Sequence, residues 1–170
     1  MKTSMLRGVV PAFVLALIVA TAWGSVVQTQ YNLAGIASIG ADAGSVRLQT
    51  TARDLFSGFF PTYGGYVVLP ALLVAFVAAA WVARHFRLGW MPQVGLYKLA
   101  GFVAVFLAIP LVNWLSPVAL LVGATRDWSC TFFMALGGVV AGLLFAVLTY
   151  RQPPVEGGSR HARRSTAPAA

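Results

Sequence analysis

Long apolar runs separated by short polar connectors dominate the chain. The runs cover residues 8–27, 62–83, 96–115 and 130–150. Each holds about 20 residues, the length that a helix needs to cross a hydrocarbon core of about 30 Å. The pattern therefore predicts an all-α membrane protein in which residues 1–150 form a domain of four transmembrane helices.

Composition supports this class and excludes several functions. The chain is 59% hydrophobic and 9% charged, whereas soluble domains carry about a quarter charged residues. Its single cysteine, Cys130, cannot form an intrachain disulfide, and no Cys/His cluster is spaced to hold a metal. We therefore predict no metal and no cofactor. The apolar runs also lack a central ionisable residue, which ion-coupled transporters use for coupling, and a non-catalytic role is favoured over an enzyme.

Basic residues divide unequally between the two ends of these runs. Nine lie on one side: Lys2, Arg7, Arg84, Arg87, Lys98, Arg151, Arg160, Arg163 and Arg164. Three lie on the other, Arg47, Arg53 and Arg126, and three aspartates balance them. This positive-inside asymmetry predicts that both termini face the cytoplasm, next to anionic headgroups of the inner leaflet. The net charge of +8 is explained by topology, so we predict no nucleic-acid partner.

The first run shares features with a signal peptide, because two basic residues precede its apolar core. Bulky Trp23 interrupts the small-residue cleavage pattern, so we expect an uncleaved first span that ends near residue 27. At the other end, residues 151–170 are basic and rich in Pro, Gly, Ser and Ala. This composition predicts a disordered cytoplasmic tail.

Residues 28–61 form the predicted first outer loop, with turns expected between Gly35 and Gly44. Leu48, Ala52 and Leu55 then recur at helical spacing after a possible N-cap at Ser45. The spacing predicts an amphipathic helix over 46–57 that lies on the outer membrane surface or caps the bundle. Beyond Pro117, residues 118–122 either extend span three or form an interfacial piece.

Polar side chains gather at the predicted outer face. The candidate cluster consists of Gln28, Gln30, Asn32, Asp42, Arg47, Arg53, Asp54, Arg126 and Asp127. Arginines at a membrane interface can bind a lipid phosphate or another anionic ligand. Alternatively, they pair with the aspartates and tie the outer helix to the loop before span four. Both alternatives remain open at this stage.

Two features predict helix packing within the membrane. Gly138 and Gly142 form a GxxxG motif, which allows two helices to approach closely. The motif serves either packing within the chain or a homodimer interface. Asn113 carries a side-chain amide inside the apolar run over 96–115, and it is expected to form an interhelical hydrogen bond.

Several polar segments also carry a resemblance. The segments are 29–33 (TQYNL), 47–51 (RLQTT), 54–55 (DL) and 61–63 (PTY). This pattern resembles small four-span bacterial inner-membrane proteins that have no assigned function. The resemblance covers about the first half of the chain and implies a multi-pass inner-membrane location, without an activity or site residues.

The sequence favours an accessory, assembly or structural subunit that binds a membrane-protein partner through its helices or its outer face. The alternative is a lipid- or small-solute-handling enzyme or permease that uses the outer arginine/amide cluster.

Overall fold

The computed structural model describes residues 2–38, 47–56, 59–115 and 127–149. These residues form helices and contain no strand. Among them, four helices are long and apolar enough to cross a membrane: Gly8–Ser38, Tyr63–His85, Trp90–Leu115 and Trp128–Thr149. The predicted all-α class with four spanning helices is confirmed.

The first helix, α1 (Lys2–Ser38), is longer than the predicted span over 8–27. It continues through Gln28, Gln30 and Asn32, which the sequence placed in a loop. No proline interrupts this stretch, and several of its polar side chains bond neighbouring helices, so nothing ends the helix at residue 27. Its apolar part, Gly8–Ser38, has 31 residues and is about 46 Å long at about 1.5 Å per residue. It therefore exceeds the hydrocarbon core by several turns.

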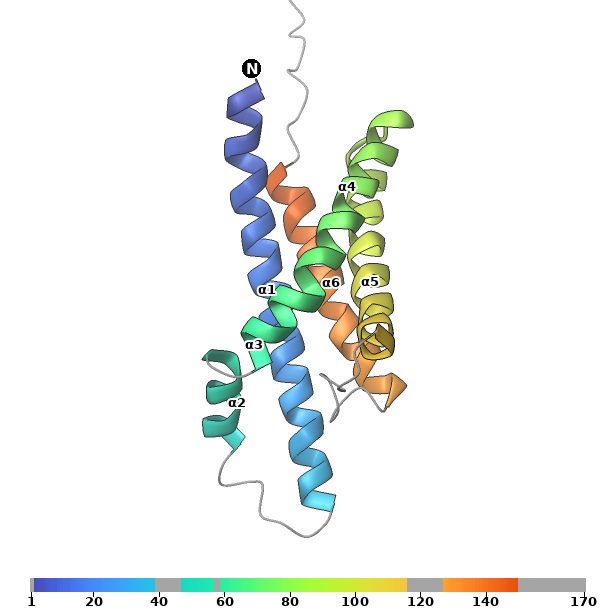
Figure 1. Cartoon of the computed structure of the whole chain (residues 1–170). Helices are drawn as coiled ribbons and strands as arrows, with labels where there is room; N and C mark the ends of the chain where they lie inside the picture. Colours follow the sequence, from blue (N-terminus) through green and yellow to red (C-terminus); the bar gives the residue numbers. More distant parts are fainter. Residues whose placement is uncertain (1, 39–46, 57–58, 116–126, 150–170) are drawn as a thin grey trace, which may run out of the picture.

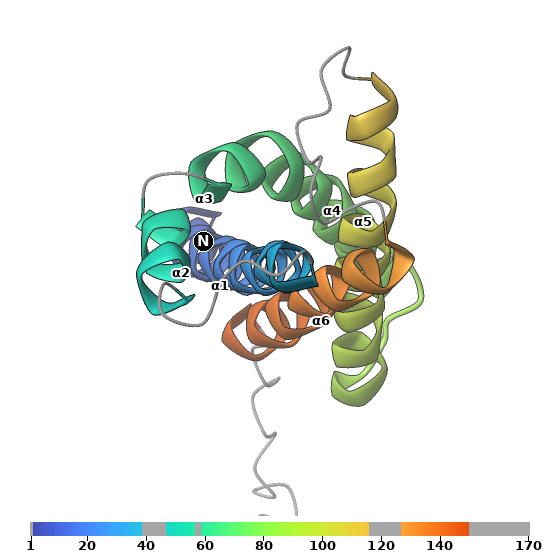
Figure 2. The same ribbon diagram turned by 90° about the horizontal axis from the view of Figure 1, so that it is seen from below.

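The spanning helices form a bundle in which α6 (Trp128–Thr149) lies between α1 and α5 (Trp90–Leu115). The beginning of α1, the connection from α4 (Leu69–His85) to α5 and the end of α6 all lie at one end of the bundle, at the top of Figure 1. We call this the basic end, because Arg84 and Arg87 belong to it. Viewed from the other end, α2 (Arg47–Phe56) lies beside α1, on the side away from α5 (Figure 2).

Helices α5 and α6 meet through glycines. A Cβ atom on Gly138 would collide with the carbonyl oxygen of Gly101, and one on Gly142 would collide with that of Tyr97. The GxxxG motif thus packs against a neighbouring helix of the same chain, and Gly101 supplies the matching small residue on α5. Since these contacts join backbone to backbone, no side-chain rotation can relieve a substitution.

One aromatic ring from each spanning helix joins the core. Phe76 of α4 stacks on Phe145 of α6 with ring centroids 4.7 Å apart. Phe13 of α1 and Tyr97 of α5 meet Phe76 edge to face, at 6.2 Å and 5.7 Å. These geometries are the favourable ones for aromatic pairs, and they bring all four helices together in the half of the bundle near the basic end.

The second spanning helix consists of a π-helical segment, η1 (Tyr63–Val68), and α4, and it is preceded by the short helix α3 (Phe59–Thr62). The amide of Leu69 bonds the carbonyl of Gly64, an i→i−5 bond in place of the usual i→i−4. Pro70 follows directly and has no N–H to give to the preceding turn. The wider π turn fits a backbone that the proline has already interrupted.

Segment η1 crosses α1 closely, with a glycine from each helix at the contact. A Cβ on Gly24 would lie 2.8 Å from Cζ of Tyr63, and one on Gly64 would lie 2.9 Å from Cγ2 of Thr21. The Tyr63 side chain is fully buried. The absence of a Cβ at these two positions is what permits this crossing.

Candidate functional site

Helix α2 contacts α1 through polar side chains. Thr29 lies 2.9 Å from Oδ2 of Asp54, and Nε2 of Gln30 donates to the hydroxyl of Thr51 over 3.2 Å. Leu48, on another face of α2, is 88% exposed. Polar groups of α2 are thus bonded to α1, while its exposed residues are of mixed character: Leu48, Gln49, Ala52 and Arg53.

A second polar contact ties α1 to the start of α6. The hydroxyl of Tyr31 donates to Oγ of Ser129 over 3.0 Å, and Ser129 donates to Oδ2 of Asp127 over 2.7 Å. Oδ1 of Asp127 accepts the backbone N–H of Ser129 at 3.1 Å, which caps the helix N-terminus. Both bonds favour the charged carboxylate, so they lower the pKa of Asp127, the Ser129 hydroxyl having the larger effect.

Buried hydroxyl and amide groups lie along one face of the second half of α1. We call Thr21, Ser25, Gln28 and Thr29 the polar seam, and all four are buried. Thr21 and Thr29 can each donate to a carbonyl one turn back, at 2.7 and 2.9 Å. Oγ of Ser25 and Oε1 of Gln28 are buried without a hydrogen-bond partner among the described residues. A buried polar group left unsatisfied costs about 1–3 kcal/mol, which makes this seam the best candidate for binding a polar group.

The predicted outer cluster is only partly assembled. Gln30 and Asp54 lie at the α1–α2 contact, Gln28 lies in the polar seam, and Asp127 caps α6. Arg53 is exposed on α2, and Asn32 is half-buried on α1. Asp42, Arg126 and the side chain of Arg47 lie outside the described residues, as do residues 118–122 and 151–170. Pairing between arginines and aspartates, and ligand binding by the arginines, therefore remain predictions.

Sequence reasoning missed the hydroxyl groups that make the contacts between helices, Thr29, Tyr31, Thr51 and Ser129, and the buried hydroxyl of Ser25. A signal was available for some of them. Thr21, Ser25 and Thr29 recur every four residues, which places them on one face of a helix. A helix that ends at residue 27 leaves Thr29 outside it, so this spacing does not then indicate one continuous face. Asn113, the other predicted packing residue, is half-buried near the end of α5.

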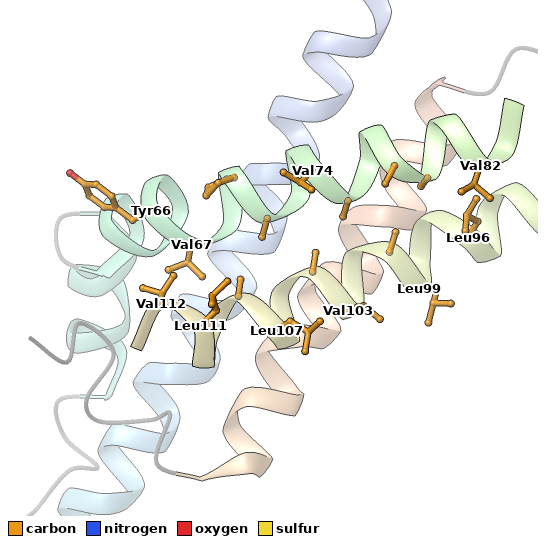
Figure 3. A pocket seen from close by; sticks show the side chains of 18 residues that line it. Tyr66, Val67, Val74, Val82, Leu96, Leu99, Val103, Leu107, Leu111 and Val112 are labelled. Carbon is orange, nitrogen blue, oxygen red and sulfur yellow. The ribbon is translucent and has the colours of Figure 1, made fainter. Parts of the chain in front are cut away.

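A long groove lies between the second and third spanning helices (Figure 3). It has a volume of about 620 Å³, and apart from the hydroxyl of Tyr66 its lining side chains are wholly apolar. Alanines recur every four residues along both sides: Ala71, Ala75, Ala79, Ala100, Ala104 and Ala108. Larger residues such as Val74 and Leu99, 69% and 61% exposed, stand beside them. The result is a groove with a narrow stripe of small residues on each helix.

No protein-family description, curated protein or solved structure matches this chain. The groove and the polar contacts are the features of the described residues that bear on function.

Proposed function

We propose that the protein is a non-catalytic integral membrane protein, an accessory or assembly subunit that binds a transmembrane helix of a partner protein. The observation that carries this proposal is the apolar groove between α4 and α5, with alanines at four-residue spacing along both helices. The proposed location is the bacterial inner membrane, with the basic end in the cytoplasm and α2 at the outer surface.

The spacing of the alanines favours a helix as the occupant. Side chains on a helix form ridges along every fourth residue, and such ridges pack into the grooves of a neighbour. In lipid, helices associate through close van der Waals packing, for which rows of small residues are the usual means. An acyl chain also fits an apolar groove, but it has no four-residue repeat to match the rows of alanines, so the spacing favours a helix.

The length of the groove agrees with a spanning occupant. On α5 its lining runs from Leu96 to Val112, about 24 Å at about 1.5 Å per residue. This is most of a hydrocarbon core of about 30 Å. The lining offers almost no hydrogen-bonding group, so a polar solute would lose its hydration without compensation.

Photo-crosslinking in intact membranes tests the proposal. A photoreactive residue at Val103, in the groove, is expected to yield a defined protein adduct, whereas one at Val147, exposed on α6, is not. Filling the groove by Ala104→Leu is expected to remove the adduct and to leave the thermal stability unchanged. Val147→Leu adds bulk outside the groove and should preserve the adduct. Adducts with lipid only, or an adduct that survives Ala104→Leu, would contradict a helix in the groove.

A second candidate function is suggested by the buried acceptors of Ser25 and Gln28. They suit a lipid or small solute with hydroxyl or amine donors, bound in the polar seam. Mass spectrometry of compounds that co-purify with the parent, Ser25→Ala, Gln28→Leu and Thr21→Val proteins tests this role. Thr21→Val is the matched control, because its hydroxyl already bonds its own helix. A compound retained by the parent and control alone supports the second function, and identical profiles exclude it.

A further inference from the structure

A second cavity, of about 460 Å³, lies at the basic end of the bundle. All four spanning helices line it, α1 with its beginning, α4 and α6 with their last turns, and α5 with its first. Its polar side chains are Arg84, Gln93, Tyr97 and Thr149. The rest of its lining is apolar and includes Val9, Phe145 and Leu148. The cavity is therefore polar on one side and apolar on the other, at the point where the spanning helices end.

The charge at this end is positive. Arg84 lines the cavity and is exposed. The acidic residues within the described part of the chain are Asp54 and Asp127. They belong to α2 and to the start of α6, at the opposite end of the bundle (Figure 1). Among the described residues, no carboxylate therefore lies at this end to compete with an external anion for the guanidinium group.

The polar groups suit a phosphodiester. A guanidinium group can give two parallel hydrogen bonds to one phosphate. Gln93 and Tyr97 are one helical turn apart on α5 and add an amide and a phenol. The hydroxyl of Thr149 donates to the carbonyl of Phe145 over 2.6 Å, so toward a ligand it acts as an acceptor. The lining thus offers hydrogen-bond donors for the phosphate oxygens and an acceptor for a headgroup hydroxyl.

We propose that this cavity binds the headgroup of an anionic phospholipid from the leaflet at the basic end, with its phosphate on Arg84. The apolar side of the cavity covers the glycerol and the first part of an acyl chain. Free phosphate would satisfy Arg84 but would leave this apolar lining uncovered. The site does not involve the α4–α5 groove, so it stands independently of the proposed partner helix.

Native mass spectrometry with phosphatidylglycerol and phosphatidylcholine as probes tests the site. We expect the parent to retain one phosphatidylglycerol, and Arg84→Gln to weaken its retention about tenfold, as expected for loss of a charge-assisted contact. The matched control is Arg87→Gln, which removes the same charge next to the same helix end but does not line the cavity. It should change retention by less than about twofold, in keeping with the small effect of exposed charges.

Equal weakening by Arg84→Gln and Arg87→Gln would overturn the site, because it would show only a diffuse attraction of basic residues for anionic lipid. Retention of phosphatidylcholine as strong as that of phosphatidylglycerol would also overturn it. In a third arm, inorganic phosphate is added as competitor. Displacement of phosphatidylglycerol by equimolar phosphate would assign the cavity to a free anion, and resistance to it supports the lipid.

Discussion

The hydroxyl oxygen of Thr29 on α1 lies 2.9 Å from a carboxylate oxygen of Asp54 on α2. The same hydroxyl lies 2.9 Å from the carbonyl oxygen of Ser25, and its single hydrogen can serve one acceptor at a time. Because a carboxylate is the stronger acceptor, we infer that this hydrogen is given mainly to Asp54. The contact then fixes the position of α2 along α1.

A double-mutant cycle of Thr29→Val and Asp54→Ala measures this contact. Each single change should lower the free energy of unfolding in micelles by about 1–3 kcal/mol, the range for a hydrogen bond to a charged group. The double variant should lose less than the sum, since both changes remove the same bond. Thr50→Val is the control on α2 and should have little effect. Additive losses would show that the two side chains do not interact.

The α5–α6 contact predicts opposite effects for two glycines of one helix. Gly101→Ala should destabilise the protein by about 3 kcal/mol, the upper range for overpacking, because its Cβ would collide with the backbone of Gly138. Gly95→Ala meets nothing within 4 Å and should stabilise by about 0.5–1 kcal/mol through helix propensity. Thermal melts of both variants measure the difference. Equal effects would contradict the glycine contact.

Asp127 predicts an acid-sensitive contribution to stability. Its pKa in the folded state is lowered by the two bonds from Ser129. A lowered folded pKa means that the contribution is present above the unfolded value of about 3.9. It is lost as the pH falls through the lower folded value.

The stability difference between the parent and Asp127→Asn should therefore shrink on acidification. Melting temperatures of both proteins, measured from about pH 6 down to about pH 2, follow this loss. A difference that is constant with pH would show that the capping bonds do not favour the charged form.

The charge asymmetry predicts which end faces the cytoplasm. In a Cys130→Ala background, Ser38→Cys at the end of α1 should react with an impermeant maleimide in intact cells. Gly89→Cys, in the connection between α4 and α5, should react only after the cells are opened. The reverse pattern would place the basic end outside and contradict the positive-inside interpretation.

The exposed face of α2 predicts contact with lipid. A fluorophore on Leu48→Cys should be quenched by lipid-bound quenchers, whereas one on Gln49→Cys should respond to water-soluble quenchers. Both residues are exposed in the structure, but they point about 100° apart on the helix. Equal quenching by the aqueous reagent would show that α2 lies away from the membrane surface.

The sequence predicted the spanning helices because each depends on a long apolar run, a property that needs no neighbours. It also predicted a helix over 46–57, close to the observed α2, because the spacing of apolar residues along one helix is a local property. It did not predict the end of α1, because polarity alone does not distinguish a loop from a helix whose polar side chains are covered by other helices, as that of Gln28 is. The sequence also did not predict that Gly101 packs against Gly138, since Gly101 belongs to no recognisable motif. The groove and the cavity at the basic end depend on tertiary arrangement, which local patterns do not encode.

The π-helical segment sets the angle, about the helix axis, between two contact surfaces of the second spanning helix. One surface holds Tyr63 and meets α1, and the other holds the alanines of the groove. The segment holds one residue more than an α-helical turn would, and Gly65 within it meets nothing within 4 Å. Deleting Gly65 would restore α geometry and rotate the helix beyond it by about 100° relative to Tyr63. Either the Tyr63 ring would leave Gly24, or Ala71 and Ala75 would turn out of the groove. A single extra residue, whatever its side chain, thus sets which face of the second span is presented to a partner.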